Sequence, residues 1–159
     1  WMPIYWPKSK FMDGKKMIGE ASKAAGRVED PVECVASLTV VINPDEQKAK
    51  MQAAGPISWY VTNMGDFYHE MLTRNGFGEE VAAMRKVAET HKPPPFGTNP
   101  ELMAAMGDRM LEETAIWGDL ETVAAGIEER RQLGVDLPSI SMPQGPLDHV
   151  ERVLGTLVS

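Results

Sequence analysis

The stretch from Thr114 to Pro143 constrains the fold more than any other part of the chain. A short apolar run at residues 115–117 is followed by a segment with helical periodicity. Asp119 is a suitable N-cap for that helix, and Gly134 suits the left-handed residue after its end. A second short apolar run, at residues 137–142, stops at the proline. Strand, helix and strand in this order are typical of a parallel sheet, so the sequence predicts an α/β fold.

Two further strands are predicted nearer the start of the chain. The run Val32–Ile42 is so continuously apolar that we expect a strand buried on both faces. The aromatic run Trp1–Trp6 is interpreted as the end of another buried strand, whose beginning would precede Trp1 and which Pro7 closes. A helix at residues 8–25 joins these two strands, and a final helix begins at Leu147. The prediction is therefore a sheet of about three parallel strands, completed by the short run at 115–117.

A helical insertion of roughly 70 residues, Pro44–Glu113, separates two of the predicted strands. Loops that follow a parallel strand usually have about 2–6 residues. An insertion this long is expected to cover a ligand site at the carboxyl ends of the strands. Its predicted parts are a helix capped by Asn43 and interrupted at Gly55-Pro56, helices at 57–74 and 79–90, an extended connector at 91–98, and a helix begun by Asn99-Pro100.

Composition excludes several classes of function. The formal net charge is −7 and no stripe of Lys and Arg offsets it, which argues against a nucleic-acid partner. No apolar run approaches the ~20 residues that cross a bilayer, so no membrane association is expected. The single cysteine, Cys34, suits a cytoplasmic protein and lies in an apolar run where a buried, inert thiol is favoured. The three histidines, His69, His91 and His149, have no partners at metal-ligand spacing, so no metal site is predicted.

An aromatic and polar run at residues 59–70 carries the candidate substrate-binding side chains. At helical spacing one face presents Tyr60, Asn63, Met64, Phe67 and Tyr68. These residues either form the wall of a pocket for a flat apolar ligand or pack against neighbouring helices, and the sequence leaves both interpretations open. His69 lies beside this face, as a structural or solvated histidine or as a general acid or base.

A second candidate lies where the run at 115–117 meets the next helix. Backbone amides at Trp117-Gly118-Asp119 are placed to hold an anion such as a phosphate. The alternative is a helix whose start is simply capped by its own side chain.

Several segments together resemble one family. In order and spacing, the chain resembles the luciferase-like monooxygenases of the bacterial luciferase superfamily, above all their coenzyme F420-dependent branch. The resemblance covers essentially all of the chain. The segments that carry it are Trp1-Met2-Pro3, Ala25-Gly26-Arg27, Asn43-Pro44-Asp45-Glu46, Phe67-Tyr68 with Arg74-Asn75-Gly76-Phe77-Gly78, Ile116-Trp117-Gly118-Asp119, and Gly134-Val135-Asp136.

The resemblance implies a (β/α)8 TIM-type barrel about twice this length, of which residues 1–159 would be a truncated C-terminal half forming a single partial-barrel domain. It implies an oxidoreductase that transfers a hydride between F420 and a small organic substrate. Two alternatives remain: an FMN-dependent monooxygenase of the same superfamily, and a half-barrel without catalytic activity that serves as an interaction module.

The resemblance also implies roles for residues. Substrate would be bound by Tyr60, Asn63, Met64, Phe67, Tyr68 and His69, and the cofactor by Trp117 and Gly118. No residue is assigned a catalytic role. Because three parallel strands cannot close a barrel, we expect the chain to form a homo-oligomer or to pair with a missing N-terminal half, and to show no turnover by itself. A clean monomer at micromolar concentration would contradict the self-association.

Overall fold

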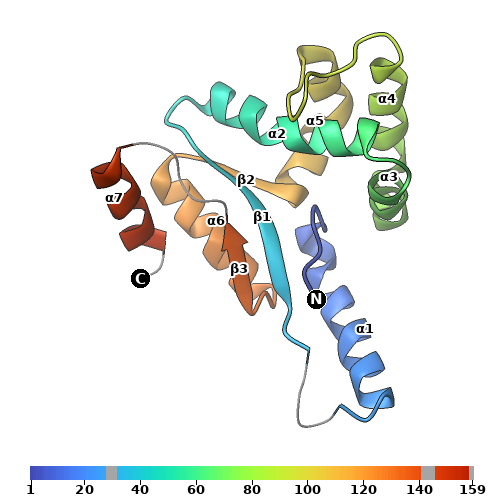
Figure 1. The fold of residues 1–159 in the computed structure, drawn as a ribbon, viewed down its shortest axis with the longest axis vertical. Coiled ribbons are helices and arrows are strands. Elements are labelled where there is room, and N and C mark those ends of the chain that lie inside the picture. Colours follow the sequence, from blue (N-terminus) through green and yellow to red (C-terminus); the bar gives the residue numbers. More distant parts are fainter. Residues whose placement is uncertain (28–31, 141–145, 158–159) are drawn as a thin grey trace.

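The computed structural model describes residues 1–27, 32–140 and 146–157 (Figure 1). A parallel sheet is flanked by helices, and a block of helices stands at one end of it. The elements are η1 (Lys8–Lys10), α1 (Phe11–Ala24), β1 (Val35–Ile42), α2 (Glu46–Asn63), α3 (Phe67–Leu72), the π-helical η2 (Thr73–Phe77), α4 (Gly78–Ala88), α5 (Pro100–Thr114), β2 (Ala115–Gly118), α6 (Leu120–Gln132), β3 (Leu137–Ile140) and α7 (Leu147–Leu157).

The three strands form a parallel sheet in the order β2-β1-β3. The carboxyl half of β1 pairs with β2, with Thr39 opposite Ala115. The amino half of β1 pairs with β3, with Val35 opposite Leu137. The strands that α6 connects therefore lie on either side of β1 and not next to each other. The predicted α/β fold with parallel strands is confirmed, and the last two residues of the predicted strand at 137–142 lie outside the described residues.

The predicted strand Trp1–Trp6 is wrong. This segment makes one isolated parallel bridge, between Ile4 and Ser37, and Val35 N donates to the carbonyl oxygen of Trp1 at 2.8 Å. A longer ladder fails because Pro3 has no amide hydrogen to donate and because Tyr5 has a φ of 56°. The two indoles of the segment pack against each other, with ring centroids 5.4 Å apart.

Strand β1 is shorter and more exposed than the sequence predicted. It begins at Val35, and only Ala36 within it is buried, so the expectation of burial on both faces is wrong. One face, with Leu38, Val40 and Ile42, packs against residues of α6 and α7. The other face is only partly covered by the insertion. Cys34, just before the strand, is 1% exposed as predicted, and its burial raises the pKa of its thiol.

The predicted start and end of α6 are confirmed. Asp119 Oδ1 accepts a hydrogen bond from Thr122 N at 2.8 Å, and Gly134 has a φ of 95° in the turn after the helix. Within α6, Arg130 is buried, and its Nη2 donates to the carbonyl oxygens of Glu112 at 3.1 Å and Ala115 at 3.3 Å. That side chain fastens the end of the insertion to the start of β2.

The first helix of the insertion differs from the prediction at its N-cap and at Gly55-Pro56. Its N-cap is Asp45, whose side chain accepts from Lys48 N at 3.1 Å, while Asn43 Oδ1 accepts from Asp45 N at 3.0 Å in a turn ahead of the helix. Gly55-Pro56 does not interrupt it, because α2 runs without a break from Glu46 to Asn63. A proline inside a helix costs about 3 kcal/mol. Complete burial of neighbours such as Ile57 offsets that loss.

The predicted helix at 57–74 is divided in two. Helix α2 ends at Asn63, Gly65 takes a φ of 67°, and α3 begins at Phe67. A second left-handed glycine, Gly76 with a φ of 93°, lies in η2 before α4. The helix predicted at 79–90 and the one begun by Asn99-Pro100 are present as α4 and α5, and Asn99 Oδ1 accepts from Leu102 N at 2.8 Å.

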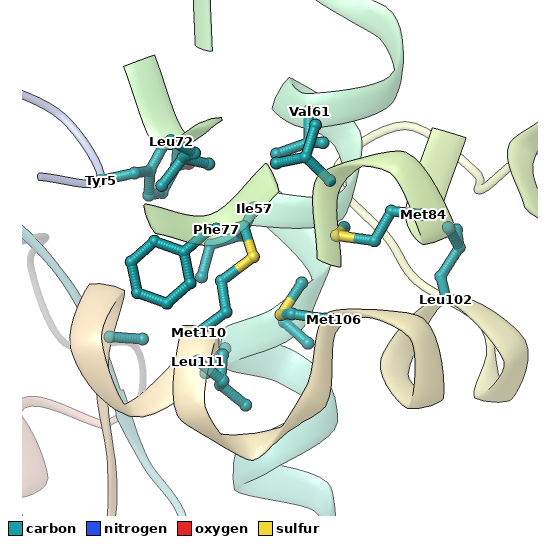
Figure 2. Packing of buried hydrophobic residues seen from close by; sticks show 14 residues of the cluster. Tyr5, Ile57, Val61, Leu72, Phe77, Met84, Leu102, Met106, Met110 and Leu111 are labelled. Atoms are coloured by element: carbon teal, nitrogen blue, oxygen red, sulfur yellow. The ribbon is translucent and has the colours of Figure 1, made fainter. Parts of the chain in front are cut away.

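Three hydrophobic clusters occur among the described residues, and the smallest consists of Phe11, Cys34, Ala36 and Val135. The sheet cluster lies between the sheet, α6 and α7, and the insertion cluster fills the block of helices (Figure 2). The sheet cluster is Ile116, Val123, Ile127, Val153 and Leu157. The insertion cluster is Tyr5, Ala53, Ala54, Ile57, Val61, Leu72, Phe77, Val81, Met84, Leu102, Met106, Met110, Leu111 and Ala115. Across residues 1–27, 32–140 and 146–157, every helix is too short or too polar to span a bilayer.

Candidate functional site

The carboxyl ends of β1 and β2 meet at one cleft. Asn43 N, just after β1, donates to the carbonyl oxygen of Gly118 at 2.8 Å, which holds the two strand ends side by side. The cleft encloses about 350 Å³. In parallel α/β folds this end of the sheet is where ligands bind. The cleft is lined by Asn43, Pro44, Glu46, Trp117, Gly118, Asp119 and Thr122.

The charges at this strand-end cleft are acidic. Two helices start there, and each is capped by its own carboxylate: Asp45 for α2 and Asp119 for α6. The pKa of Asp119 lies below its usual range because the Thr122 amide and side chain hydrogen-bond to it, and the Lys48 side chain and amide lower the pKa of Asp45. The capped-helix interpretation of residues 117–119 therefore holds, and the cleft disfavours a phosphate.

Trp117 and Gly118 shape the wall of the same cleft. Trp117 is half-buried and packs against the insertion cluster. Gly118 has a φ of 139°, and a Cβ there would lie 2.9 Å from Thr122 Cγ2, so glycine is required for both conformation and space. The indole thus offers an uncharged aromatic surface at the strand ends, where the surrounding carboxylates repel anions.

An aromatic group of Tyr5, Tyr60 and Tyr68 lies between the sheet and the insertion. The ring centroids of Tyr60 and Tyr68 are 4.7 Å apart, and both rings meet Tyr5 edge-on, at 5.2 and 6.0 Å. Burial raises the pKa of Tyr5, and nearby Tyr60 and Tyr68 raise it further, against a hydrogen bond with Thr39 that lowers it. Burial also raises the pKa of Tyr68. These two phenols stay protonated at neutral pH and are hydrogen-bond donors.

Tyr5 is the member of this group that the sequence did not suggest. Its left-handed backbone turns the side chain into the insertion cluster, where it is 6% exposed. The sequence did not predict this turn, because residues other than glycine seldom adopt a φ above zero.

The structure separates the residues predicted to share one helical face. Tyr60 and Tyr68 come together, whereas Met64 is 48% exposed and Phe67 is 71% exposed. Asn63 Nδ2 donates to the carbonyl oxygen of Trp59 at 3.3 Å. The common face is lost because the left-handed turn at Gly65 ends α2 and gives α3 a new direction.

His69 is engaged with charged groups at the surface. Its Nε2 lies 3.8 Å from Asp66 Oδ1, and its Nδ1 is adjacent to the Arg85 guanidinium. Its side chain is 19% exposed. These neighbours favour a structural role and give no support to general acid–base chemistry by this ring.

A family profile decides where the chain belongs. The profile of the luciferase-like monooxygenases matches residues 1–137. The chain belongs to this family. The family expected from the sequence is confirmed by this match.

Two relatives of this luciferase-like chain come from Methanopyrus kandleri. The chain is 31% identical over 129 residues to its 5,10-methylenetetrahydromethanopterin reductase. The fold matches the solved structure of a coenzyme F420-dependent tetrahydromethanopterin reductase with a TM-score of 0.58 at 23% identity. The first match covers 81% of this chain and 35% of the relative, and the second covers 94% and 41%. The luciferase-like chain thus spans well under half the length of either protein.

Proposed function

We propose that this luciferase-like chain forms part of an oxidoreductase that transfers a hydride between coenzyme F420 and a small organic substrate. The observation that carries the proposal is the aromatic surface at the strand ends, with Trp117 in the cleft and Tyr5, Tyr60 and Tyr68 beside the sheet. The reductase to which the chain is 31% identical supports the same chemistry.

The residues at the strand ends fit the uncharged part of such a cofactor. The deazaflavin, when bound, accepts or donates the hydride. Trp117 supplies a flat apolar wall for a ring system, and Gly118 leaves the backbone open to close approach. The two carboxylates that line the cleft, Glu46 and Asp119, disfavour a phosphate there. We propose that Trp117 and Gly118 contact the ring system and that anionic groups of the cofactor lie elsewhere.

The tyrosines have a different proposed role. Tyr60 and Tyr68 form the substrate wall together with Tyr5, whose raised pKa keeps a donor proton on its oxygen. A protonated phenol in a partly dry site orients a carbonyl or ring nitrogen of a substrate by donating a hydrogen bond. We propose that the outer edge of this region is lined by three other predicted substrate-binding residues, His69, Asn63 and Met64.

The sheet itself is proposed to be completed by other strands. Leu137 on β3 is 55% exposed, and three parallel strands leave apolar edges that a closed barrel does not have. Further strands from a second copy or from the rest of a longer barrel would cover those edges. A cytoplasmic location accords with the proposal and with the lone buried cysteine.

Spectral titration of the full-length protein with F420 and with FMN tests the proposed function. We expect F420 to bind, and Trp117→Ala to weaken its binding roughly 3- to 10-fold because an aromatic contact is lost. Trp59→Ala is the matched control, since Trp59 contacts Phe96 and not the strand-end cleft. Equal F420 affinity in both variants would remove Trp117 from the cofactor site. Binding of FMN without F420 would favour the monooxygenase, and binding of neither would favour an interaction module.

A further inference from the structure

A groove lies between α1 and the segment formed by α3 and η2. These helices lie on the side of β1 away from α6 and α7 (Figure 1). It encloses about 470 Å³, which lies within the range of ~300–1,000 Å³ that holds small organic ligands. Phe67, one of the residues predicted to bind substrate, is among its lining residues. The chemistry of the groove therefore indicates which kind of substrate the protein binds.

The two walls of the groove are largely apolar. Trp6 and Met17 belong to the α1 wall, and Phe67 and Met71 to the α3 wall. Met17 is 68% exposed and Phe67 is 71% exposed. The Trp6 indole is fixed, because its Nε1 donates to the carbonyl oxygen of Lys10 at 3.0 Å and its ring packs edge-on against Trp1. A flat molecule between Trp6 and Phe67 would cover both exposed aromatic surfaces.

The charges along the groove cancel within each wall. Lys10 Nζ lies 3.9 Å from Asp13 Oδ2 on α1, and Arg74 Nη2 lies 3.0 Å from Glu70 Oε2 across the end of α3. Each wall thus carries one cation and one anion that face each other one helical turn apart. The groove lining therefore has no unpaired charge that would favour an anionic or a cationic ligand.

Glycines in a left-handed conformation bound the α3 wall. Gly65 lies before α3, and Gly76 marks the kink between this wall and α4. The apolar side chains Met17 and Met71 are unbranched and fill irregular spaces. These features allow the groove to fit ligands of differing outline but similar polarity.

We propose that this groove receives a flat, aromatic and uncharged part of the substrate, held between Trp6 and Phe67. The inference rests on the proposed oxidoreductase function, because it treats the ligand of the groove as the substrate. It assigns the substrate class by chemistry: a molecule that carries an aromatic or heteroaromatic ring without net charge.

Equilibrium binding of a neutral fluorescent probe to the full-length protein tests the proposal. N-phenyl-1-naphthylamine is flat, apolar and uncharged, and we expect it to bind with a fluorescence increase. Phe67→Ala should weaken this binding roughly 3- to 10-fold. Phe96→Ala is the matched control, because Phe96 is 61% exposed and packs near Trp59, away from the groove. The anionic probe 8-anilinonaphthalene-1-sulfonate should bind more weakly, and its affinity should not depend on Phe67.

Three outcomes would overturn the proposal: no binding of the neutral probe, equal effects of Phe67→Ala and Phe96→Ala, or a change in sedimentation coefficient on Phe67→Ala alone. The last would assign the groove to contact with a second copy of the chain. The F420 titration is a separate measurement. A Phe67-dependent probe site in a protein that binds neither F420 nor FMN would support the ligand class of the groove and would contradict the oxidoreductase function alone.

Discussion

The sheet cluster and the insertion cluster are both dry hydrophobic cores, but they are built from different side chains. The sheet cluster is wholly aliphatic and mostly β-branched, with Ile116, Val123 and Ile127 at its centre. The insertion cluster relies on methionines, among them Met106 and Met110, packed around Phe77 (Figure 2). β-Branched side chains have one preferred rotamer in a helix, whereas methionine adapts to irregular space. The sheet side is therefore the stiff part, and the insertion is the compliant part.

The compliant core lies next to the candidate site. Tyr5 belongs to the insertion cluster, and Tyr60, Tyr68, Met71 and Trp117 pack against it. We therefore expect the methionines of the insertion to accommodate changes at the candidate site without disturbing the pairing of β1 with its neighbours. Each of the following predictions tests one side of this contrast.

The largest effect is expected for Phe77→Ala in the insertion cluster. Phe77 is 2% exposed, and its ring also receives the Arg109 guanidinium 4.2 Å from its centroid. Removal of a buried phenylalanine ring costs about 3–5 kcal/mol. The free energy of unfolding, measured by urea denaturation followed by circular dichroism, should fall by that amount.

Phe67→Ala is the control, because the same truncation at a 71% exposed position should change stability by no more than about 0.5 kcal/mol. A loss below about 1 kcal/mol for Phe77→Ala would mean that the methionines refill the space completely. The side chains of the insertion cluster would then repack more easily than their close packing around Phe77 suggests.

The stiffness of the sheet cluster is tested by a pair of helical glycines. A Cβ on Gly126 of α6 would lie 2.6 Å from Ile116 Cγ2, whereas a Cβ on Gly155 of α7 would meet no atom within 4 Å. Gly126→Ala should therefore destabilise the protein by roughly 1–3 kcal/mol through overpacking. Gly155→Ala should stabilise it by up to about 1 kcal/mol through helix propensity. The two variants are compared by thermal and urea denaturation, and a stabilising Gly126→Ala would show that Ile116 moves aside easily.

The smallest effect concerns pH and lies at the amino end of the sheet. Asp136 Oδ1 accepts from Lys15 Nζ at 2.5 Å and its Oδ2 accepts from Cys34 N at 2.9 Å. The hydrogen bond from Lys15, and then that from the Cys34 amide, hold the pKa of Asp136 below its usual value. The ionised carboxylate therefore stabilises the fold above about pH 4, and this contribution is lost as the pH falls through the lower folded pKa.

Asp136→Asn should make the free energy of unfolding less dependent on pH in that acidic range. The effect should be roughly 0.2–1 kcal/mol, since the carboxylate is 41% exposed. Lys15→Met should reduce the pH dependence in the same way, because it removes the stronger partner. An unchanged profile in both variants would place the acid sensitivity of the fold elsewhere.

Local signals in the sequence predicted the parts of the fold that depend on local chemistry. Asp119 and Gly134 marked the ends of α6, and Asn99 marked the start of α5, because caps and left-handed turns are decided by one or two side chains. The strand–helix–strand pattern at residues 114–143 predicted the parallel sheet, which the structure confirms. The family resemblance implied that this sheet is part of a larger fold, in agreement with the match to part of a solved reductase.

The rest depended on contacts between distant residues. Pro56 stays inside α2 because burial of its neighbours outweighs a broken backbone hydrogen bond, and propensity alone favours the opposite outcome. The turn at Gly65 separated Phe67 from Tyr60, so a face drawn on one continuous helix could not predict which side chains meet. Tyr5 joined the site through a backbone conformation that its sequence neighbours do not specify.

The register of β2 against β1 has a consequence for how such chains can diverge. The helical insertion leaves the sheet after Ile42 and returns at Ala115, which pairs with Thr39, so both of its ends are held by the same pair of strands. Doubling the length of a flexible loop costs only about 0.6 kcal/mol in closure entropy. Residues can therefore be gained in the exposed turns of the insertion, such as the one at Gly65, at little cost to the sheet, and the strands keep their register.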